Sequence, residues 1–184
     1  LPGPLDSFAL SGVPATATAG SSFSLTVVAK DAYGNVKTDY TGTVHFASTD
    51  TDGPVLPVDT AFNTSDQGSK QFTVTLKTAS SETITVTPLG SSTPTVTSSG
   101  IAVAPATASQ LAFVTGPATT ASDQSIANVV VRAVDAYSNT ATGYTGDITL
   151  AIGNNAGAGT LSGTLTVVAV SGVATFTGLS IDKT

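Results

Sequence analysis

The chain has 184 residues, a formal net charge of −6, six lysines and arginines, and no cysteine. So few basic side chains cannot form a phosphate-binding stripe, which disfavours nucleic acid as a partner. Charged residues make up 10% of the chain, against about 25% in ordinary domains. The β-branched Thr, abundant here, suits the half-exposed face of a strand. This composition predicts an all-β extracellular protein of a cell surface, and no apolar run approaches the ~20 residues of a membrane span.

Alternation of apolar and polar residues marks the strands in the first half of the chain. Leu25, Val27 and Ala29 alternate with mostly polar neighbours, which is the period of a strand with one buried face. The expected strands cover residues 8–10, 23–29, 43–47, 58–62, 72–76, 83–87 and 100–103. Seven short strands in about 100 residues predict an antiparallel immunoglobulin-like (Ig-like) β-sandwich.

The phrase AKDAYGNVKTDYTGTV, beginning at Ala29, returns as AVDAYSNTATGYTGDI at Ala133. Five pairs share one offset (135 − 31 = 104): Asp31 with Asp135, Tyr33 with Tyr137, Asn35 with Asn139, Tyr40 with Tyr144 and Gly42 with Gly146. A fixed offset of this length indicates a tandem repeat. We therefore expect a linker at residues 1–5, a first Ig-like module at residues 6–104 and a second at residues 105–184, together forming an elongated rod.

The second module repeats the early strands of the first, with strands expected at residues 111–114, 129–134, 147–152, 165–170 and 173–181. Counterparts of SETITVTP and SSGIAVAP, which end the first module, do not follow within this sequence. We expect the second module to lack about two C-terminal strands, which would leave apolar faces and backbone edges open. The more ordinary explanation for the missing strands is that this sequence is a piece of a longer protein. The alternative is completion by a strand from a neighbouring chain, as in donor-strand complementation.

The repeated phrase is the first candidate site. Asp31 and Asp135 end a predicted strand, and the Gly and Asn residues that follow favour a turn. We expect Asp31 to accept backbone N–H bonds there, and Tyr33 and Tyr40 to pack at the sandwich edge with their hydroxyls on the backbone. The predicted corner comprises Asp31, Tyr33, Asn35 and Tyr40, with Asp135, Tyr137, Asn139 and Tyr144. Its recurrence favours a structural role, and a ligand site repeated in each module is the alternative.

Other motifs give weaker signals for chemistry. His45 is the only histidine and is expected on the polar face of a strand, without the arrangement of a catalytic His. Asp50 and Asp52 resemble the start of a calcium loop but lack its final Glu. Asn63 begins an N-glycosylation sequon. The Gly-rich run at Gly153 fits no phosphate-binding motif. We predict no catalytic residue and no cofactor, with calcium as the weak exception.

DAYGN followed by YTGTVHF and ETITVTP, and then VDAYSNTATGYTGDITLAIGN with GVATFTGLSIDKT, resembles the Ig-like repeats of large bacterial surface proteins. These are distant relatives of invasin/intimin-type and filamin-type repeats. The resemblance implies a stalk, surface-layer piece or filament subunit without enzymatic activity. Its partners would be neighbouring Ig-like modules or identical subunits, with glycans as a further option. Fold does not fix function, so an adhesin that binds a glycan or host protein and an accessory domain of a secreted enzyme stay as alternatives.

Overall fold

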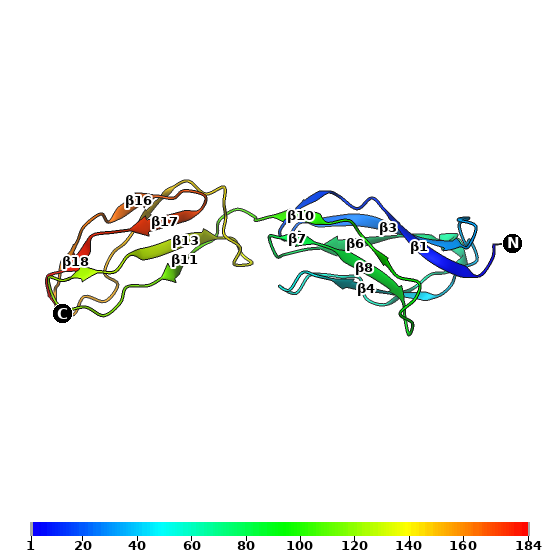
Figure 1. Ribbon diagram of the computed structural model, residues 1–184, viewed down its shortest axis with the longest axis horizontal. Helices are drawn as coiled ribbons and strands as arrows, with labels where there is room; N and C mark the ends of the chain where they lie inside the picture. Colours follow the sequence, from blue (N-terminus) through cyan, green and yellow to red (C-terminus); the bar gives the residue numbers. More distant parts are fainter. Residues whose placement is uncertain (1, 184) are drawn as a thin grey trace. The chain divides into compact units, whose positions relative to one another are not determined.

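The computed structural model describes residues 2–183 (Figure 1). The chain divides into two compact units, Leu1–Ala104 and Pro105–Thr184. Strands are the regular elements of the described residues, apart from one 3-10 turn at Thr64–Asp66. The prediction of an all-β fold is therefore confirmed. Within residues 2–183 there is no helix with the length and apolar character that crossing a bilayer requires.

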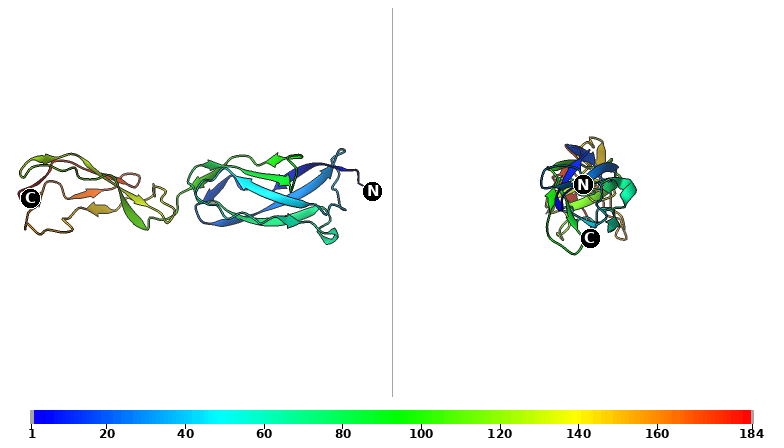
Figure 2. Two further views of the ribbon diagram at one scale, coloured as in Figure 1. Left: turned by 90° about the horizontal axis from the view of Figure 1, so that it is seen from below. Right: turned by 90° about the vertical axis from the view of Figure 1, so that its right-hand side faces the viewer.

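Unit 1 is a sandwich of two main sheets (Figures 1 and 2). The first sheet has the order β1 (Leu5–Ser11), β3 (Ser22–Asp31), β6 (Ser69–Thr75). The second has the order β5 (Thr60–Ala61), β4 (Thr43–Ser48), β8 (Ile84–Pro88), β9 (Val96–Thr97). A small third sheet joins β2 (Thr16–Thr18), β10 (Ile101–Ala104) and β7 (Ser81–Glu82). All pairs are antiparallel except β10 with β2.

The alternation in sequence becomes alternation in burial. In β3, Leu25, Val27 and Ala29 are buried while the residues between them are partly exposed. β8 contributes Ile84 and Val86, both fully buried, from the opposite sheet. Each such side chain removed from water contributes about 1.5–3 kcal/mol to folding, so the two facing rows form the apolar interior.

A chain of aromatic rings crosses this interior. The ring of Tyr40 meets Phe8 at 5.6 Å and Phe62 at 5.1 Å between centroids, both edge-to-face. Phe72 continues the chain, at 6.2 Å from Phe62 and 4.8 Å from Phe46. Such pairs add about 0.5–1.5 kcal/mol each beyond their burial, and they take the place of the disulfide and Trp of antibody domains.

Unit 2 repeats part of this plan. Its first sheet has the order β11 (Gln110–Thr115), β13 (Val129–Val134), β17 (Val173–Phe176). Two smaller sheets are β14 (Asp147–Thr149) with β16 (Thr166–Val168), and β12 (Ser125–Ile126), β18 (Leu179–Ile181), β15 (Leu161–Ser162). Phe176 is fully buried at the centre of the core, beside Val129 and Ile148.

Candidate functional site

The repeated phrase forms a turn organised around one buried carboxylate. In unit 1, Asp31 Oδ1 accepts hydrogen bonds from the backbone N–H of Tyr33 at 3.0 Å and of Asn35 at 2.9 Å. Asp31 Oδ2 accepts from the Gly3 backbone at 3.1 Å and from Asn35 Nδ2 at 3.2 Å. The backbone closes the turn, because Gly34 N donates to the Asp31 carbonyl at 2.9 Å. This is the backbone anchoring expected of Asp31 from the sequence.

Unit 2 builds the same turn from the second copy of the phrase. Asp135 Oδ1 accepts from the backbone of Tyr137 at 2.9 Å and of Asn139 at 3.0 Å. Asp135 Oδ2 accepts from the Ala106 backbone at 2.9 Å and from Asn139 Nδ2 at 2.9 Å. Ser138 N donates to the Asp135 carbonyl at 3.2 Å, as Gly34 N does to that of Asp31. All five contacts thus use the same atoms in the two units, although the donor residues Gly3 and Gly34 are replaced by Ala106 and Ser138.

These contacts stabilise the charged form of each carboxylate. The hydrogen bond from Gly3 N, aided by those from Asn35 and Tyr33, holds the pKa of Asp31 below its usual value. Burial alone would raise the pKa of Asp135, but hydrogen bonds from Asn139 and Ala106 help to outweigh it and lower this pKa. Both side chains therefore stay ionised at neutral pH and serve as fixed acceptors.

The tyrosines of the phrase divide into two kinds. Tyr40 is buried between Phe8 and Phe62, in the core and not at the sandwich edge where it was expected, and burial raises the pKa of its hydroxyl. The expectation that Tyr33 packs at the sandwich edge is wrong, because 87% of its surface is exposed. Tyr33 lies on the outer side of the turn, since its own N–H bonds to Asp31 and its side chain is directed to solvent.

In unit 2, Tyr144 is half-buried, and its hydroxyl donates a hydrogen bond to the Asp147 carbonyl, three residues further on, at 3.2 Å. This hydroxyl therefore bonds to the backbone, but on the downstream side, unlike a tyrosine corner. Tyr137, the counterpart of Tyr33, is partly exposed.

Two glycines complete the corner. A Cβ placed on Gly42 would lie 2.6 Å from Tyr40 Cζ, and one on Gly146 would lie 2.9 Å from Tyr144 Cζ. The Tyr ring therefore covers the backbone two residues further on, and a larger residue there collides with the ring. The repeated Tyr-Thr-Gly was the sequence signal for this contact, but the corner predicted from the sequence included the tyrosine and not the glycine.

The calcium candidates occupy different environments. Asp50 is buried, and its carboxylate accepts hydrogen bonds from the backbones of Asp52, Lys77 and Thr78 and from the Thr78 hydroxyl. Asp52 is exposed. Residues 2–183 contain no group of three His, Cys, Asp or Glu side chains placed to hold a metal ion. The hydrogen bonds to Asp50 fix the segment that follows β6. Calcium binding at Asp50 and Asp52 stays a prediction.

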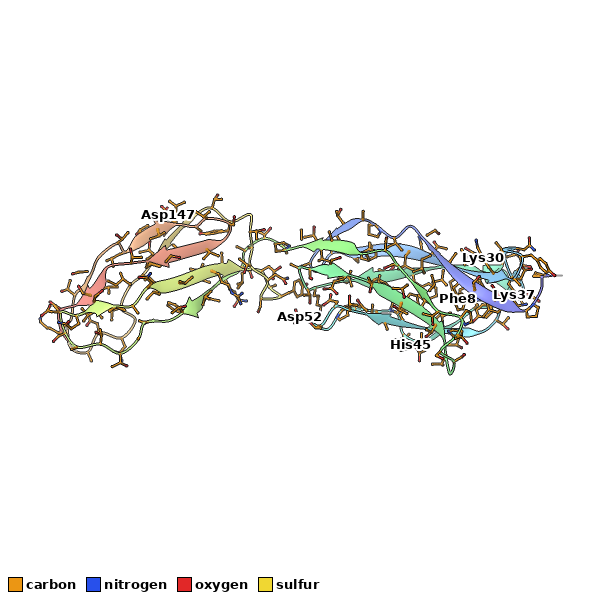
Figure 3. The ribbon with its side chains drawn as sticks, viewed as in Figure 1. Phe8, Lys30, Lys37, His45, Asp52 and Asp147 are labelled. Atoms are coloured by element: carbon orange, nitrogen blue, oxygen red, sulfur yellow. The ribbon has the colours of Figure 1, made fainter. Side chains whose placement is uncertain are left out.

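Asn63 and His45 lie on the surface. Asn63 caps the 3-10 turn, with its Oδ1 accepting from the backbone N–H of Ser65 and Asp66. Glycosylation of this exposed side chain stays a prediction. His45 Nδ1 lies 2.7 Å from Asp59 Oδ1 on the outer side of β4 (Figure 3), and about half of each side chain is exposed.

Unit 2 also carries an apolar groove that unit 1 lacks in the corresponding position. In unit 1, β4 is bonded on both edges: Phe62 N donates to the Gly42 carbonyl, and Leu89 N donates to the Thr43 carbonyl. Among the described residues of unit 2, only the first bond has a counterpart, from Ala169 N to the Gly146 carbonyl. On the edge of β14 that corresponds to the β8 side, the described residues provide no strand.

The same opening exposes the neighbouring sheet. Phe8 and Leu111 occupy matching positions, opposite Ala29 and Ala133 of the central strands. Phe8 is 5% exposed, whereas Leu111 is 55% exposed and Phe113 61%. A cavity of about 190 Å³ lies between this sheet and β14, against Leu111, Phe113 and Ile148. A second cavity, of about 250 Å³, shares Phe113 and Leu150 with it and lies against residues 150–153, which follow β14. Its apolar lining includes Phe113, Ile126, Leu150, Leu161, Leu179 and Ile181.

The sequence matches no protein-family model, and no curated protein matches it. Among solved structures, the chain is similar to FdeC, an adhesin of Escherichia coli, at 19% identity over 96% of this chain and 55% of that chain, with a TM-score of 0.50. It is also similar to domains 5–6 of the S-layer protein SbsC, at 18% identity over 97% of this chain and 96% of that chain, with a TM-score of 0.43.

A third similar structure is the adhesin InvE of Yersinia pseudotuberculosis, at 20% identity over 95% of this chain and 50% of that chain, with a TM-score of 0.46. The chain thus spans about half the length of the FdeC and InvE structures. At these identities the likeness concerns the fold alone, and the FdeC match carries it. The chain has the Ig-like fold of bacterial surface-protein modules, which confirms the resemblance seen in its sequence.

Proposed function

We propose that this chain is an architectural segment of a cell-surface protein, in which Ig-like modules act as a stalk, surface-layer piece or filament subunit. The observation that carries the proposal is the use of the repeated corner. In both units the carboxylate of the phrase is bonded to the backbone of its own unit, and Tyr40 is packed in the core. A polar motif whose side chains are used in this way stabilises the fold of both modules, and this role requires no substrate. We accordingly propose no enzymatic activity.

The adhesin alternative has one observation in its favour, the exposed ring of Tyr33 at the tip of the turn. An array of glycans and host-surface proteins, probed with the full chain, separates the two functions. We expect no reproducible binding. Binding that disappears in Tyr33→Ser, while Tyr33→Phe retains it, would replace the architectural proposal with a recognition function.

We further propose that a β-strand from a neighbouring chain occupies the groove of unit 2. The support comes from unit 1, where β8 lies against β4 at the corresponding place with Ile84 and Val86 fully buried. The open edge of β14 offers backbone groups for such a strand, and the apolar lining offers room for alternate aliphatic side chains. A strand of the Ile-x-Val type therefore suits the groove in both hydrogen bonding and shape.

A synthetic peptide with the sequence of residues 81–88, SETITVTP, tests this proposal on the full chain by NMR titration. Amide shifts should move at β14 and β11, and the β4 amides of unit 1 should not move. The matched control is the same peptide with Asp in place of Ile84 and Val86, which should not bind. Absence of any shift with the native peptide at millimolar concentration would reject strand addition at this groove.

A further inference from the structure

The corner carboxylate also holds the chain that enters each unit. Asp31 Oδ2 accepts from the backbone N–H of Gly3, two residues before β1 begins. Asp135 Oδ2 accepts from the backbone N–H of Ala106, four residues before β11 begins. Gly3 and Ala106 are different residue types, but each donates its backbone N–H, so the hydrogen bond is the same in both units. We call this pair of contacts, Asp31 with Gly3 and Asp135 with Ala106, the clamp.

In unit 1 the clamp holds the entering segment on two sides. Lys37 Nζ donates to the Gly3 carbonyl at 2.9 Å and also pairs with Asp39 at 2.9 Å. Figure 3 shows Lys37 close to the end of unit 1 where β1 begins. The offset of 104 places Ala141 at the corresponding position of unit 2, so the Lys37 contact has no counterpart there. The clamp of unit 2 thus consists of the carboxylate contact.

The clamp is placed where the load on a tandem protein would arrive. Asp31 is the last residue of β3, which is bonded to β1 on one edge and β6 on the other. The pairing of β1 with β3 starts with Leu5 opposite Asp31, so Gly3 precedes the first pair of the sheet. In unit 2, Asp135 directly follows β13, the central strand between β11 and β17. A pull on the entering segment therefore reaches the carboxylate before it reaches the strand pairs.

We propose that the corner aspartate of each unit is a backbone-binding site for the segment that enters the unit, and that it transfers tension from that segment to the central strand. The charge of the carboxylate strengthens the contact, since hydrogen bonds to ionised acceptors are roughly twice as strong as neutral ones. The inference rests on the proposed architectural function. It assigns the Asp-Ala-Tyr-x-Asn phrase a task beyond the turn itself, namely fixing the segment that links modules.

Replacing Asp31 by Asn separates the clamp from the turn. The single amide oxygen can keep the Oδ1 position, where it accepts from Tyr33 and Asn35, and the amide group then faces the Gly3 N–H, which has no acceptor. Asn35 can rotate its own amide to meet the new donor, so the loss falls on Gly3. Asp135→Asn does the same to Ala106 and serves as the matched variant in the other unit.

Amide hydrogen exchange of the full chain, measured by NMR, is the readout. In Asp31→Asn, exchange at Gly3 should accelerate about tenfold or more, while Ala106 and the turn amides of Tyr33 and Asn35 keep their rates. Asp135→Asn should reverse the pattern. Unchanged exchange at Gly3, or equal acceleration at Gly3 and in the turn, would overturn the clamp.

Lys37→Met keeps the proposal testable if Asp31→Asn fails to fold. It leaves the carboxylate in place and removes the contact to the Gly3 carbonyl, so exchange at Gly3 should rise several-fold and Ala106 should be unaffected. An unchanged Gly3 rate in this variant would contradict the two-sided clamp. The array experiment tests the architectural function independently of the clamp. Binding on the array together with an intact clamp would reject only the architectural function. No binding together with an unchanged Gly3 exchange rate would reject only the clamp.

Discussion

At the residue scale, three of the four buried carboxylates in the described residues accept hydrogen bonds from backbone N–H groups and fix the local structure of their loops. Asp31, Asp50 and Asp135 are each surrounded by backbone N–H donors. A buried charge without such partners is strongly unfavourable, whereas a fully hydrogen-bonded one fixes the backbone that donates to it. The polar residues that look most reactive in the sequence are therefore the ones that hold loops in place.

The stability of the chain should fall in acid for this reason. Hydrogen bonds hold the pKa of Asp31 below its usual value, and those of Asp50 and Asp135 are lowered despite burial. The contribution is present above the unfolded pKa of about 3.9 and is lost as the pH falls through the lower folded values. Urea unfolding should show a lower midpoint at pH 3 than at pH 7, and Asp50→Asn should reduce that difference. Equal midpoints at both pH values would contradict this linkage.

Gly42→Ala tests the contact between the Tyr ring and the glycine. The new Cβ would lie 2.6 Å from Tyr40 Cζ. The shifts needed to relieve such overpacking typically lower the free energy of unfolding by about 1–3 kcal/mol. Gly143→Ala is the matched control, because nothing lies within 4 Å of its Cβ position and its effect should stay within about 0.5 kcal/mol. Urea denaturation measures both, and equal effects at the two glycines would refute the steric explanation.

At the scale of elements, the difference between the units lies in what covers the first sheet. β1 and β11 pair with their central strands in the same register over residues 7–10 and 110–113, but β8 and β9 cover the sandwich only in unit 1, among the described residues. The large side chains of β11 consequently remain in contact with water.

Truncation of the matching residues should therefore have unequal effects. Phe8→Ala removes a buried ring and should cost about 3–5 kcal/mol of unfolding free energy. Leu111→Ala, at the matching position, should cost about 0.5 kcal/mol because the side chain is largely exposed. Denaturation followed by NMR signals of each unit separates the two effects. A comparable cost at Leu111 would mean that its side chain is covered in solution.

Sequence periodicity located the long strands well, because alternation and burial have the same period of two. The strand expected at residues 23–29 lies within β3, and that at residues 129–134 is β13. The strand expected at residues 173–181 is instead divided into β17 and β18, since Gly178 adopts a left-handed φ of 66° between them. The short strands β2, β9, β12 and β15 were not expected, because two or three residues are too few to show a period.

The site was less predictable than the strands. Turn chemistry identified Asp31 and Asp135 from their residue types and spacing. It did not separate Tyr33 from Tyr40, because burial depends on the direction each side chain takes from the turn. The partners Gly3 and Ala106 contribute only a backbone N–H, which almost any residue type can supply. The sequence therefore could not identify them.

At the scale of the whole molecule, the chain is two units built from one plan, each with a corner that anchors its entering segment. We propose that these units carry tension along the protein. The direct test is single-molecule force spectroscopy on the full chain held at its two ends. At about 3.4 Å per residue, unfolding should release roughly 350 Å of extended chain from unit 1 and roughly 270 Å from residues 105–184 of unit 2.

We expect discrete unfolding events, one for each unit. Asp31→Asn should lower the unfolding force of unit 1 alone, and Asp135→Asn that of unit 2 alone. Smooth extension at low force without discrete events, or forces that neither substitution changes, would contradict it.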